Sequence, residues 1–494
     1  MLRRSSLAAG VEEALRDLGG SFLPWDEATG VRFDLAIAAS ENDQLAELDA
    51  PVLLVPHGAG HQKFYPYTSV VSGLNPDRLV VDGRVVPAAI ALPHRAHLRR
   101  LRQACPPAAP YGVVVGDPAL ARMRGSQFRS EYLRAAFGAQ EKRLVVMAST
   151  FGPESALGQF PDLPERLAAG LPSDEYQVVV VLHPGVWAAH GPWQVRAWLS
   201  QATRYGVHVI APHEGWQAAL LAASVVISDH GSLALYATAL DKPVVLVGRG
   251  SAVTVPGSAA AVLAAGAPIW DPGSDPRTQL DTVIREHDRA VRDSVVKLLV
   301  DPSVDGAECA RRLRTLMYRL LKLAEPAAPA TFAQVPAPSV VSGPAPAWVA
   351  GAEVRPDGVR IERYPDLGTG DPHDALSYRH LVADIRTADL PQMGSASIVL
   401  TDDSTTGTVR RWAEQAPERL GRWPQATMLA TVLDHTSCAV WTRAGLLLLS
   451  ADEVIDPVVL ASLAYARLAI TGHLPARDRL HLGDRVIAVA VAAG

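Results

Sequence analysis

Lysine and cysteine are both scarce in this sequence. Only five of the 494 residues are lysines, so arginine carries nearly all of the positive charge, and its forked guanidinium group suits phosphate ligands. The three cysteines lie far apart and form neither a CxxC pair nor a metal-binding spacing. We therefore expect buried thiols in a reducing cytoplasm, and we expect no metal site.

Long apolar runs and several common motifs are also missing. No stretch of about twenty residues lacks charges and helix breakers, so we expect no membrane span, while peripheral contact with a membrane stays open. The net charge of −5 argues against a nucleic-acid partner. The chain has no GxxxxGK(S/T), no GxGxxG after its first strand and no GxSxG. These absences speak against P-loop, dinucleotide-binding and serine-hydrolase sites.

What the sequence does contain is a regular alternation of strand-like and helix-like segments. The strand candidates are short, Val-rich and nearly continuous in apolar character, which is typical of parallel strands covered on both faces. They lie at 33–40, 51–58, 111–118, 143–150, 176–185, 206–212, 223–231 and 242–248. Helix candidates lie at 127–138, 192–205 and 231–240. This alternation predicts open, doubly wound α/β sheets.

The length of the chain requires more than one domain. We expect a Rossmann-like, acceptor-side lobe at 1–125 and a second, donor-side lobe at 126–324, which a basic helix at 309–324 closes. A Pro/Ala-rich linker at 325–348 follows. Residues 349–494 then form a small α+β domain of unknown role. It has strand candidates at 397–401, 438–449 and 485–492 and a helix candidate at 456–469.

Ligands of open α/β sheets collect at the carboxyl ends of the strands, which directs attention to two histidines. His57 follows the run PVLLVP, and Gly58 lets the chain turn. A histidine there can take a proton from an attacking hydroxyl, although a structural loop histidine fits the position as well. His61 and Lys63 lie close by and could hold an anion. His183 ends a very apolar strand and could donate to a phosphate oxygen, or cap the next helix.

The third and most specific segment is VVISDHGSLAL. A strand runs into Asp229, His230 and Gly231, and Ser232 begins a helix. The N–H groups and dipole of a helix N-terminus attract phosphate, Gly231 would let the ligand approach, and the Ser232 hydroxyl adds a donor. Ordinary helix capping by Asp229 or Ser232 is the alternative.

Three further residues are weaker candidates. Ser149 and Thr150 end a strand at the same sheet edge and could touch a donor. Glu214, near the start of a helix, could meet a ribose, although helix capping explains it as well.

The order of these motifs resembles the CDP-glycerol glycerophosphotransferases, the family of teichoic-acid polymerases and primases. That family has an HG pair, an HP pair, a T-D-Y-S-S segment and a D-K-P. This chain has His57-Gly58, His183-Pro184, residues 228–232 and Asp241-Lys242-Pro243. The resemblance implies a GT-B fold with two Rossmann-like lobes and a metal-independent displacement that needs no cofactor. It also implies that His57 is the base and that His183 and Ser232 bind the donor diphosphate.

Some positions depart from that pattern. The first serine of the family is Gly231 here, its tyrosine is His230, and Tyr236 stands where an acidic residue is expected. Phe151-Gly152 replaces a tryptophan-arginine pair. CDP-glycerol itself is therefore in doubt as the donor.

Three hypotheses follow from these observations. The first is a bacterial, cytoplasmic transferase that moves a glycerol-phosphate, polyol-phosphate or sugar group from a nucleotide diphosphate, with cytidine as the expected base, to a hydroxyl acceptor. The second is a nucleotide-sugar glycosyltransferase or epimerase of the same fold. The third is a non-catalytic binding protein that retains the fold. Each of the three hypotheses is compatible with a homo-oligomer.

Overall fold

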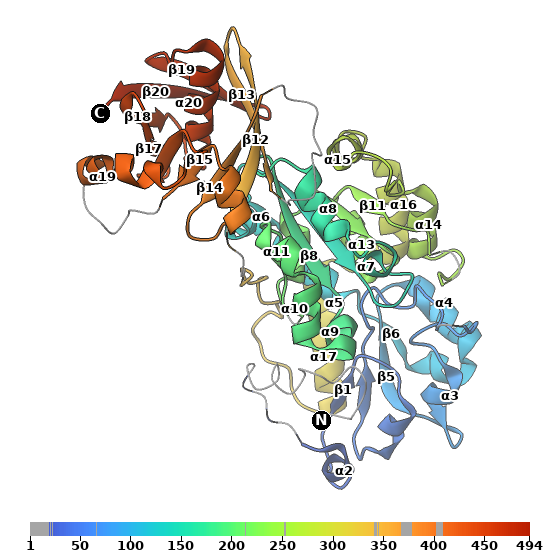
Figure 1. The fold of residues 1–494 in the computed structure, drawn as a ribbon. Helices are drawn as coiled ribbons and strands as arrows, with labels where there is room; N and C mark the ends of the chain where they lie inside the picture. Colours follow the sequence, from blue (N-terminus) through green and yellow to red (C-terminus); the bar gives the residue numbers. More distant parts are fainter. Residues whose placement is uncertain are drawn as a thin grey trace.

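The computed structural model describes residues 19, 21 and 23–494, apart from 66, 213, 251–252, 340–342, 344, 367–377 and 402–408. The chain forms two α/β lobes and a C-terminal barrel, and the second lobe lies between the other two parts (Figure 1). The extreme N-terminus, where the basic start of the sequence lies, is outside the described residues.

The first lobe contains a four-stranded parallel sheet whose strands lie in chain order. They are β1 (Ala36–Ala38), β2 (Val52–Leu54), β5 (Pro87–Leu92) and β6 (Gly112–Val114). The helix α4 (Arg95–Ala104) packs beside β5 and β6. Because the strand order never reverses, this described sheet is not doubly wound, and the expectation of two doubly wound lobes is wrong here.

The second lobe contains a five-stranded parallel sheet in the order β11-β10-β7-β8-β9. Its strands are β7 (Arg143–Ser149), β8 (Tyr176–Leu182), β9 (His208–Val209), β10 (Val225–Ser228) and β11 (Val244–Leu246). Successive residues of β7 enter different cores, since Leu144 and Val146 pack in one cluster and Val145 and Met147 in another. A sheet covered on both faces explains why this strand is apolar throughout.

The strand order of the second sheet reverses between β7 and β10, so this lobe is doubly wound as expected. Such a reversal opens a crevice outside the carboxyl ends of the two strands, where ligands bind in folds of this kind. The helices that flank the sheet include α9 (Pro184–His190), α12 (Trp216–Ala222) and α13 (Ser232–Ala239).

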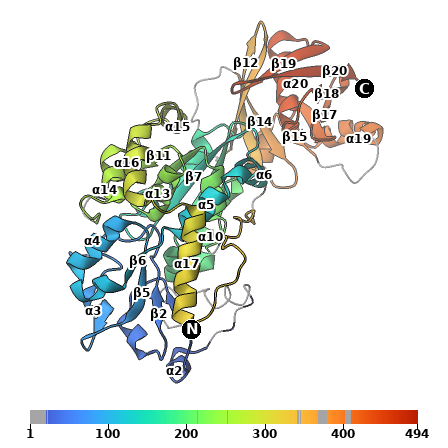
Figure 2. The same cartoon turned by 180° about the vertical axis from the view of Figure 1, so that it is seen from behind.

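The helix expected to close the second lobe, α17 (Gly306–Leu321), crosses back to the first lobe. Its residue Leu316 packs with Leu53, Ala91 and Val115 of the first sheet, and Figure 2 shows it beside the β2 and β5 strands. The helix is apolar along one side only, and that side packs against one face of the first sheet.

The Pro/Ala-rich segment after α17 is held on the surface of the second lobe. Arg122 donates to the carbonyls of Ala333 and Gln334, at 2.9 and 3.1 Å. The Arg129 guanidinium donates to the carbonyl of Val335 at 2.6 Å, and the Val335 side chain is buried in the lobe's core. The segment is therefore a bound strap over at least this part, and its last residues already belong to strand β12 (Ala347–Arg355).

The C-terminal part, where we expected a small α+β domain, combines helices with a closed nine-stranded barrel, a closure that the sequence analysis did not predict. The order around it is β12-β13-β19-β20-β18-β17-β16-β15-β14. The other strands are β13 (Gly358–Pro365), β14 (Tyr378–Asp384), β15 (Ile398–Leu400), β16 (Met428–Val432), β17 (Ser437–Thr442), β18 (Gly445–Ala451), β19 (Arg477–Leu482) and β20 (Arg485–Ala493). The segment 438–449, expected as one strand, is the hairpin of β17 and β18.

A helix, α20 (Val458–Thr471), contacts every strand from β12 to β18. Its residues Val459 to Ala464 are buried all round, and they share one core with Ile398, Leu400 and Met428 of the barrel. The intervening Val399 packs instead against α19 (Val409–Gly421) in a second cluster. The period-two alternation thus separates the core around α20 from the core under α19.

Candidate functional site

Loops from both lobes meet at the carboxyl ends of β2, β7, β8 and β10. His57 follows β2, and His183 follows β8 as the N-cap residue of α9. The centroids of the two imidazole rings are 6.4 Å apart. Ser232, after β10, reaches across the lobe boundary, because its Oγ accepts a hydrogen bond from the backbone N–H of Ala59 at 3.2 Å. The structure therefore brings together three residues that the sequence singles out.

Gly58 is the residue that makes this close approach possible. Its φ of +57° lies in the left-handed region, which side chains other than glycine adopt at a cost. A Cβ atom at this position would stand 2.5 Å from the Ser232 Oγ. A larger residue would therefore have to displace the Ser232 hydroxyl from its hydrogen bond with Ala59.

The orientation of His183 follows from its hydrogen bond. The N–H of Gly185 donates to His183 Nδ1 at 2.9 Å, so in the neutral ring the proton lies on Nε2. Burial, together with the nearby His57 and Lys63, lowers the pKa of His183 to about 4, although Asp229 raises it in part. At neutral pH the ring is thus an uncharged donor at the junction of the lobes.

The charge environment of His57 combines opposing effects. Loss of solvent around the ring lowers its pKa and the Lys63 ammonium lowers it as well, whereas the Glu41 carboxylate raises it. His57 is still exposed, so a substrate can reach it. Lys63 is half-buried; desolvation lowers its pKa, and Asp229 raises it in part.

Two further residues lie near these histidines: Glu41, which the sequence analysis missed, and Phe151, which it named only as a departure from the family pattern. Glu41 follows β1 and is buried, and it accepts hydrogen bonds from the Tyr65 hydroxyl at 2.6 Å and the Gly73 N–H at 2.9 Å. Its place after a strand was a signal that could have found it. Phe151 lies with its ring centroid 5.1 Å from that of His183 and is 55% exposed. It offers an aromatic face beside the site.

Asp229 organises the turn around Ser232. One carboxylate oxygen accepts from the Thr150 N–H at 2.7 Å, the Thr150 hydroxyl at 2.8 Å and the Ala156 N–H at 3.0 Å. The other oxygen accepts from the Gly231 N–H at 2.9 Å. These bonds hold the loops after β7 and β10 together, so Asp229 and Thr150 face each other.

Three more residues of this region make contacts within the protein itself: Ser149, His230 and Gly231. The Ser149 hydroxyl accepts from the Leu157 N–H at 2.9 Å. A Cβ on Gly231 would meet the Thr150 methyl group at 2.8 Å, so the missing side chain makes room for Thr150. His230 is half-buried, lies against Gly250, and has its pKa lowered by burial and by Lys63.

His61 does not face the junction of the lobes, contrary to our expectation of an anion-holding role. It is buried in the first lobe, with its Nδ1 3.1 Å from the Nδ1 of His97 on α4. Burial lowers its pKa to about 3, so it carries no charge at neutral pH. Glu214 is exposed just before α12, where Gly215 is the N-cap residue, and Glu214 therefore does not cap that helix.

The D-K-P segment has a structural role. Asp241 has a φ of +61° and accepts from His287 Nε2 and Arg292 at 3.0 Å each. The Lys242 ammonium donates to the Leu221 carbonyl at 2.9 Å. The segment thus fixes the chain between α13 and β11, away from the loops described above.

Tyr236 joins the two lobes below the site. Its hydroxyl donates to the buried carboxylate of Asp117 at 2.9 Å, and Asp117 also caps α5 (Pro118–Gly125). Phenylalanine at Tyr236 leaves that carboxylate without its donor, so we expect the free energy of unfolding to fall by about 1–3 kcal/mol. Urea denaturation measures this change, and Tyr132→Phe, at an exposed tyrosine, is the control. An equal stability of the two variants would contradict the role of this bond.

Backbone hydrogen bonds close the lobes against each other. The Phe64 N–H donates to the Val253 carbonyl, and the Val255 N–H donates to the Gln62 carbonyl, both at 2.9 Å. Arg95 forms a bidentate ion pair with Asp301 at 2.7–2.8 Å. The loop that carries Lys63 is therefore held in a fixed position beside the second lobe.

Two further observations concern metals and membranes. In the part of the chain that the structure describes, no group of three or more His, Cys, Asp or Glu side chains could hold a metal ion. Among the same residues, no helix combines the length and the apolar character that crossing a bilayer requires.

Comparison with known proteins gives structural similarity only. No family model matches the sequence, and no curated protein matches it. A variant of the wall teichoic acid polymerase TagF is 15% identical, with a TM-score of 0.42 over 61% of this chain and 77% of that one. S. aureus MnaA, in a co-structure with UDP, is 13% identical, with a TM-score of 0.37 over 66% of this chain and 83% of that one. UDP-GlcNAc 2-epimerase from Neisseria meningitidis is 15% identical, with a TM-score of 0.35 over 64% of this chain and 83% of that one. With TM-scores below 0.5, a function has to be argued from the site itself.

Proposed function

We propose that this chain is a GT-B-type transferase. It would move a glycerol-phosphate, polyol-phosphate or sugar group from a nucleotide diphosphate donor, with cytidine as the expected base, to a hydroxyl acceptor. One observation carries the proposal: imidazoles from the two lobes stand 6.4 Å apart beside Ser232 at the strand-order reversal of the second sheet. Ligand sites of doubly wound sheets lie at such a reversal.

In this reaction His57 is the base. Its lowered pKa keeps the ring neutral at neutral pH, so it can accept the proton of the acceptor hydroxyl. The acceptor oxygen then forms a bond to the transferred group while the bond from that group to the nucleotide phosphate breaks. We expect the His183 Nε2–H and the Lys63 ammonium to stabilise the charge that develops on the leaving phosphate.

A thermal-shift screen tests donor binding. We expect one of CDP, CMP, UDP and GDP derivatives to raise the melting temperature of the wild type, because a ligand at 100 times its Kd stabilises by about 2.7 kcal/mol. In Ser232→Ala the shift should shrink, whereas Ser200→Ala, at an exposed serine, should keep it. If no nucleotide shifts the wild type, or if Ser232→Ala responds fully, the donor site is placed wrongly.

The non-catalytic alternative has one specific observation in its favour. Both carboxylate oxygens of Asp229 and the Ser232 Oγ already accept hydrogen bonds from the protein itself. A protein that only binds its ligand does not need these oxygen atoms to be available to a donor diphosphate. A nucleotide that stabilises the wild type, with no nucleotide release for any hydroxyl acceptor tried, would favour this alternative over the transferase.

A further inference from the structure

An exposed aromatic ring borders the two imidazoles of the candidate site. Phe151 lies on the loop after β7 and is 55% exposed, and its ring centroid is 5.1 Å from that of His183, with 51° between the ring planes. Among the described residues, the rings of His57 and His183 contact no ring other than each other and Phe151. A ligand that covers this apolar ring gains free energy by removing it from water.

The loop that carries Phe151 is held in place on both sides of the ring. Asp229 accepts hydrogen bonds from the N–H groups of Thr150 and Ala156, at 2.7 and 3.0 Å, and both reach the same carboxylate oxygen. A single exposed aromatic residue is common on a protein surface. A ring on a loop fixed in this way differs from that case, because the backbone has little freedom left to lose when a ligand stacks on it.

His183 and Phe151 offer a ligand two different kinds of contact. The Gly185 N–H occupies Nδ1 of His183, and the Nε2–H has no acceptor among the described residues, so it can donate to a phosphate oxygen. Phe151 has no polar group, so its ring suits a flat part of the ligand. A nucleotide joins such parts through its ribose, with a phosphate at one end and a base at the other.

We infer that Phe151 is the platform on which the base of the donor nucleotide stacks, while the phosphate next to the ribose lies against the His183 Nε2–H. This inference rests on the proposed function and adds the residue that holds the base. Phe151 belongs to the second lobe, as His183 and Ser232 do, which favours the donor base over a ring of the acceptor. Because every base has a π face, this stacking does not distinguish cytosine from uracil or guanine.

Isothermal titration calorimetry on the full chain tests this inference, with CDP, UDP and GDP as the probes. For each probe that binds the wild type, we expect Phe151→Ala to weaken binding by about tenfold or more, because stacking between base and side chain is lost. Phe151→Trp should restore the affinity, since it presents a larger aromatic face. Phe128→Ala, at a phenylalanine that is 78% exposed elsewhere on the second lobe, should bind like the wild type.

Inorganic pyrophosphate provides a probe without a base, and Phe151→Ala should leave its affinity unchanged. An equal loss of pyrophosphate binding would show that Phe151 acts by positioning His183, and would overturn the inference. Unchanged nucleotide affinity in Phe151→Ala, or no recovery in Phe151→Trp, would overturn it while leaving the proposed donor site intact. If none of the three nucleotides binds the wild type, the proposed donor site is itself wrong and the inference falls with it.

Discussion

Replacement of His57 by asparagine is expected to slow nucleotide release from the donor by about 10²–10⁴-fold, the range that a general base contributes. Donor binding should change little, because His183, Ser232 and Lys63 remain in place. Asparagine retains a polar group of similar reach but cannot accept a proton at neutral pH. The measurement is single-turnover nucleotide release together with the nucleotide-induced thermal shift of the same variant.

The pH profile adds a second reading of the same residue. The pKa of His57 in the folded protein is lowered below 6.5, so its base form remains populated in mildly acidic solution. We therefore expect kcat/KM to decline only at a pH below that at which a free histidine titrates. His190→Gln, at an exposed histidine of α9, is the matched control and should leave the profile unchanged. Normal turnover by His57→Asn would remove the base assignment altogether.

Acidification is expected to destabilise the protein well above the pH at which carboxylates titrate. His61, His97 and His380 are buried, and burial lowers the pKa of His61 and of His380 to about 3 and that of His97 far below its usual value. Between these values and 6.5 the unfolded chain binds protons that the folded chain does not. Stability is therefore complete above about 6.5 and falls as the pH drops below it.

The slope of this loss is up to about 1.4 kcal/mol per pH unit for each histidine. Urea midpoints between pH 7.5 and 5.0 measure it. His380→Gln, which keeps a polar group near Ser462, should flatten the curve, and His473→Gln, at an exposed histidine, should not. A midpoint that is constant across this interval would show that the three rings are not held neutral.

The second sheet was the most predictable part of the fold. Its strands β7, β8 and β10 are buried on both faces, so each is an apolar run that stands out in the sequence. Strand β5 of the first lobe was missed because it reads PAAIAL, and alanine and proline are poor strand residues. Some barrel strands, such as β13 and β19, carry many charged residues, and the closure of the barrel depends on pairings such as Val359 with Leu480, which no local pattern reveals.

The hairpin in the barrel illustrates a boundary that local sequence conceals. The turn between β17 and β18 consists of Arg443 and Ala444, neither of which favours a turn, and only Gly445 marks it. The eight apolar residues around it therefore resemble one strand. The linker prediction failed at its end for a related reason, because Ala347 and Trp348 begin a strand despite following a Pro/Ala-rich stretch.

Ligands of open α/β sheets bind at the carboxyl ends of the strands. This rule identified residues of the candidate site but did not predict where their side chains point. His57, His183 and Ser232 do come together, since they follow β2, β8 and β10, whose carboxyl ends face the boundary between the two lobes. His61 turns inward to His97, and Ser149 turns to Leu157. Those contacts join residues that are far apart in the sequence or depend on one rotamer, so composition and spacing could not reveal them.

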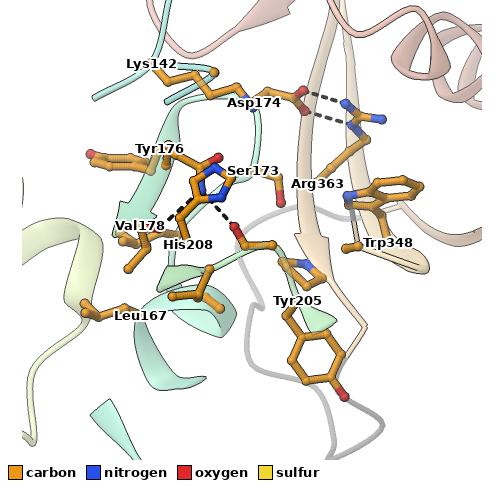
Figure 3. A pocket seen from close by; sticks show the side chains of 18 of the residues that line it. Lys142, Leu167, Ser173, Asp174, Tyr176, Val178, Tyr205, His208, Trp348 and Arg363 are labelled. Atoms are coloured by element: carbon orange, nitrogen blue, oxygen red, sulfur yellow. Dashed lines mark hydrogen bonds and ion pairs between the residues drawn. The ribbon is translucent and has the colours of Figure 1, made fainter. Parts of the chain in front are cut away.

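The strap after α17 has a mechanical consequence. It is tied at Ala328 by Arg314, at Ala333 and Gln334 by Arg122 and at Val335 by Arg129, and the barrel beyond it is held again through Arg363. Rotation of the barrel away from the second lobe would have to separate Arg363 from Asp174 (Figure 3), and the strap limits how far the start of the barrel can travel. We therefore expect the barrel and the second lobe to move together.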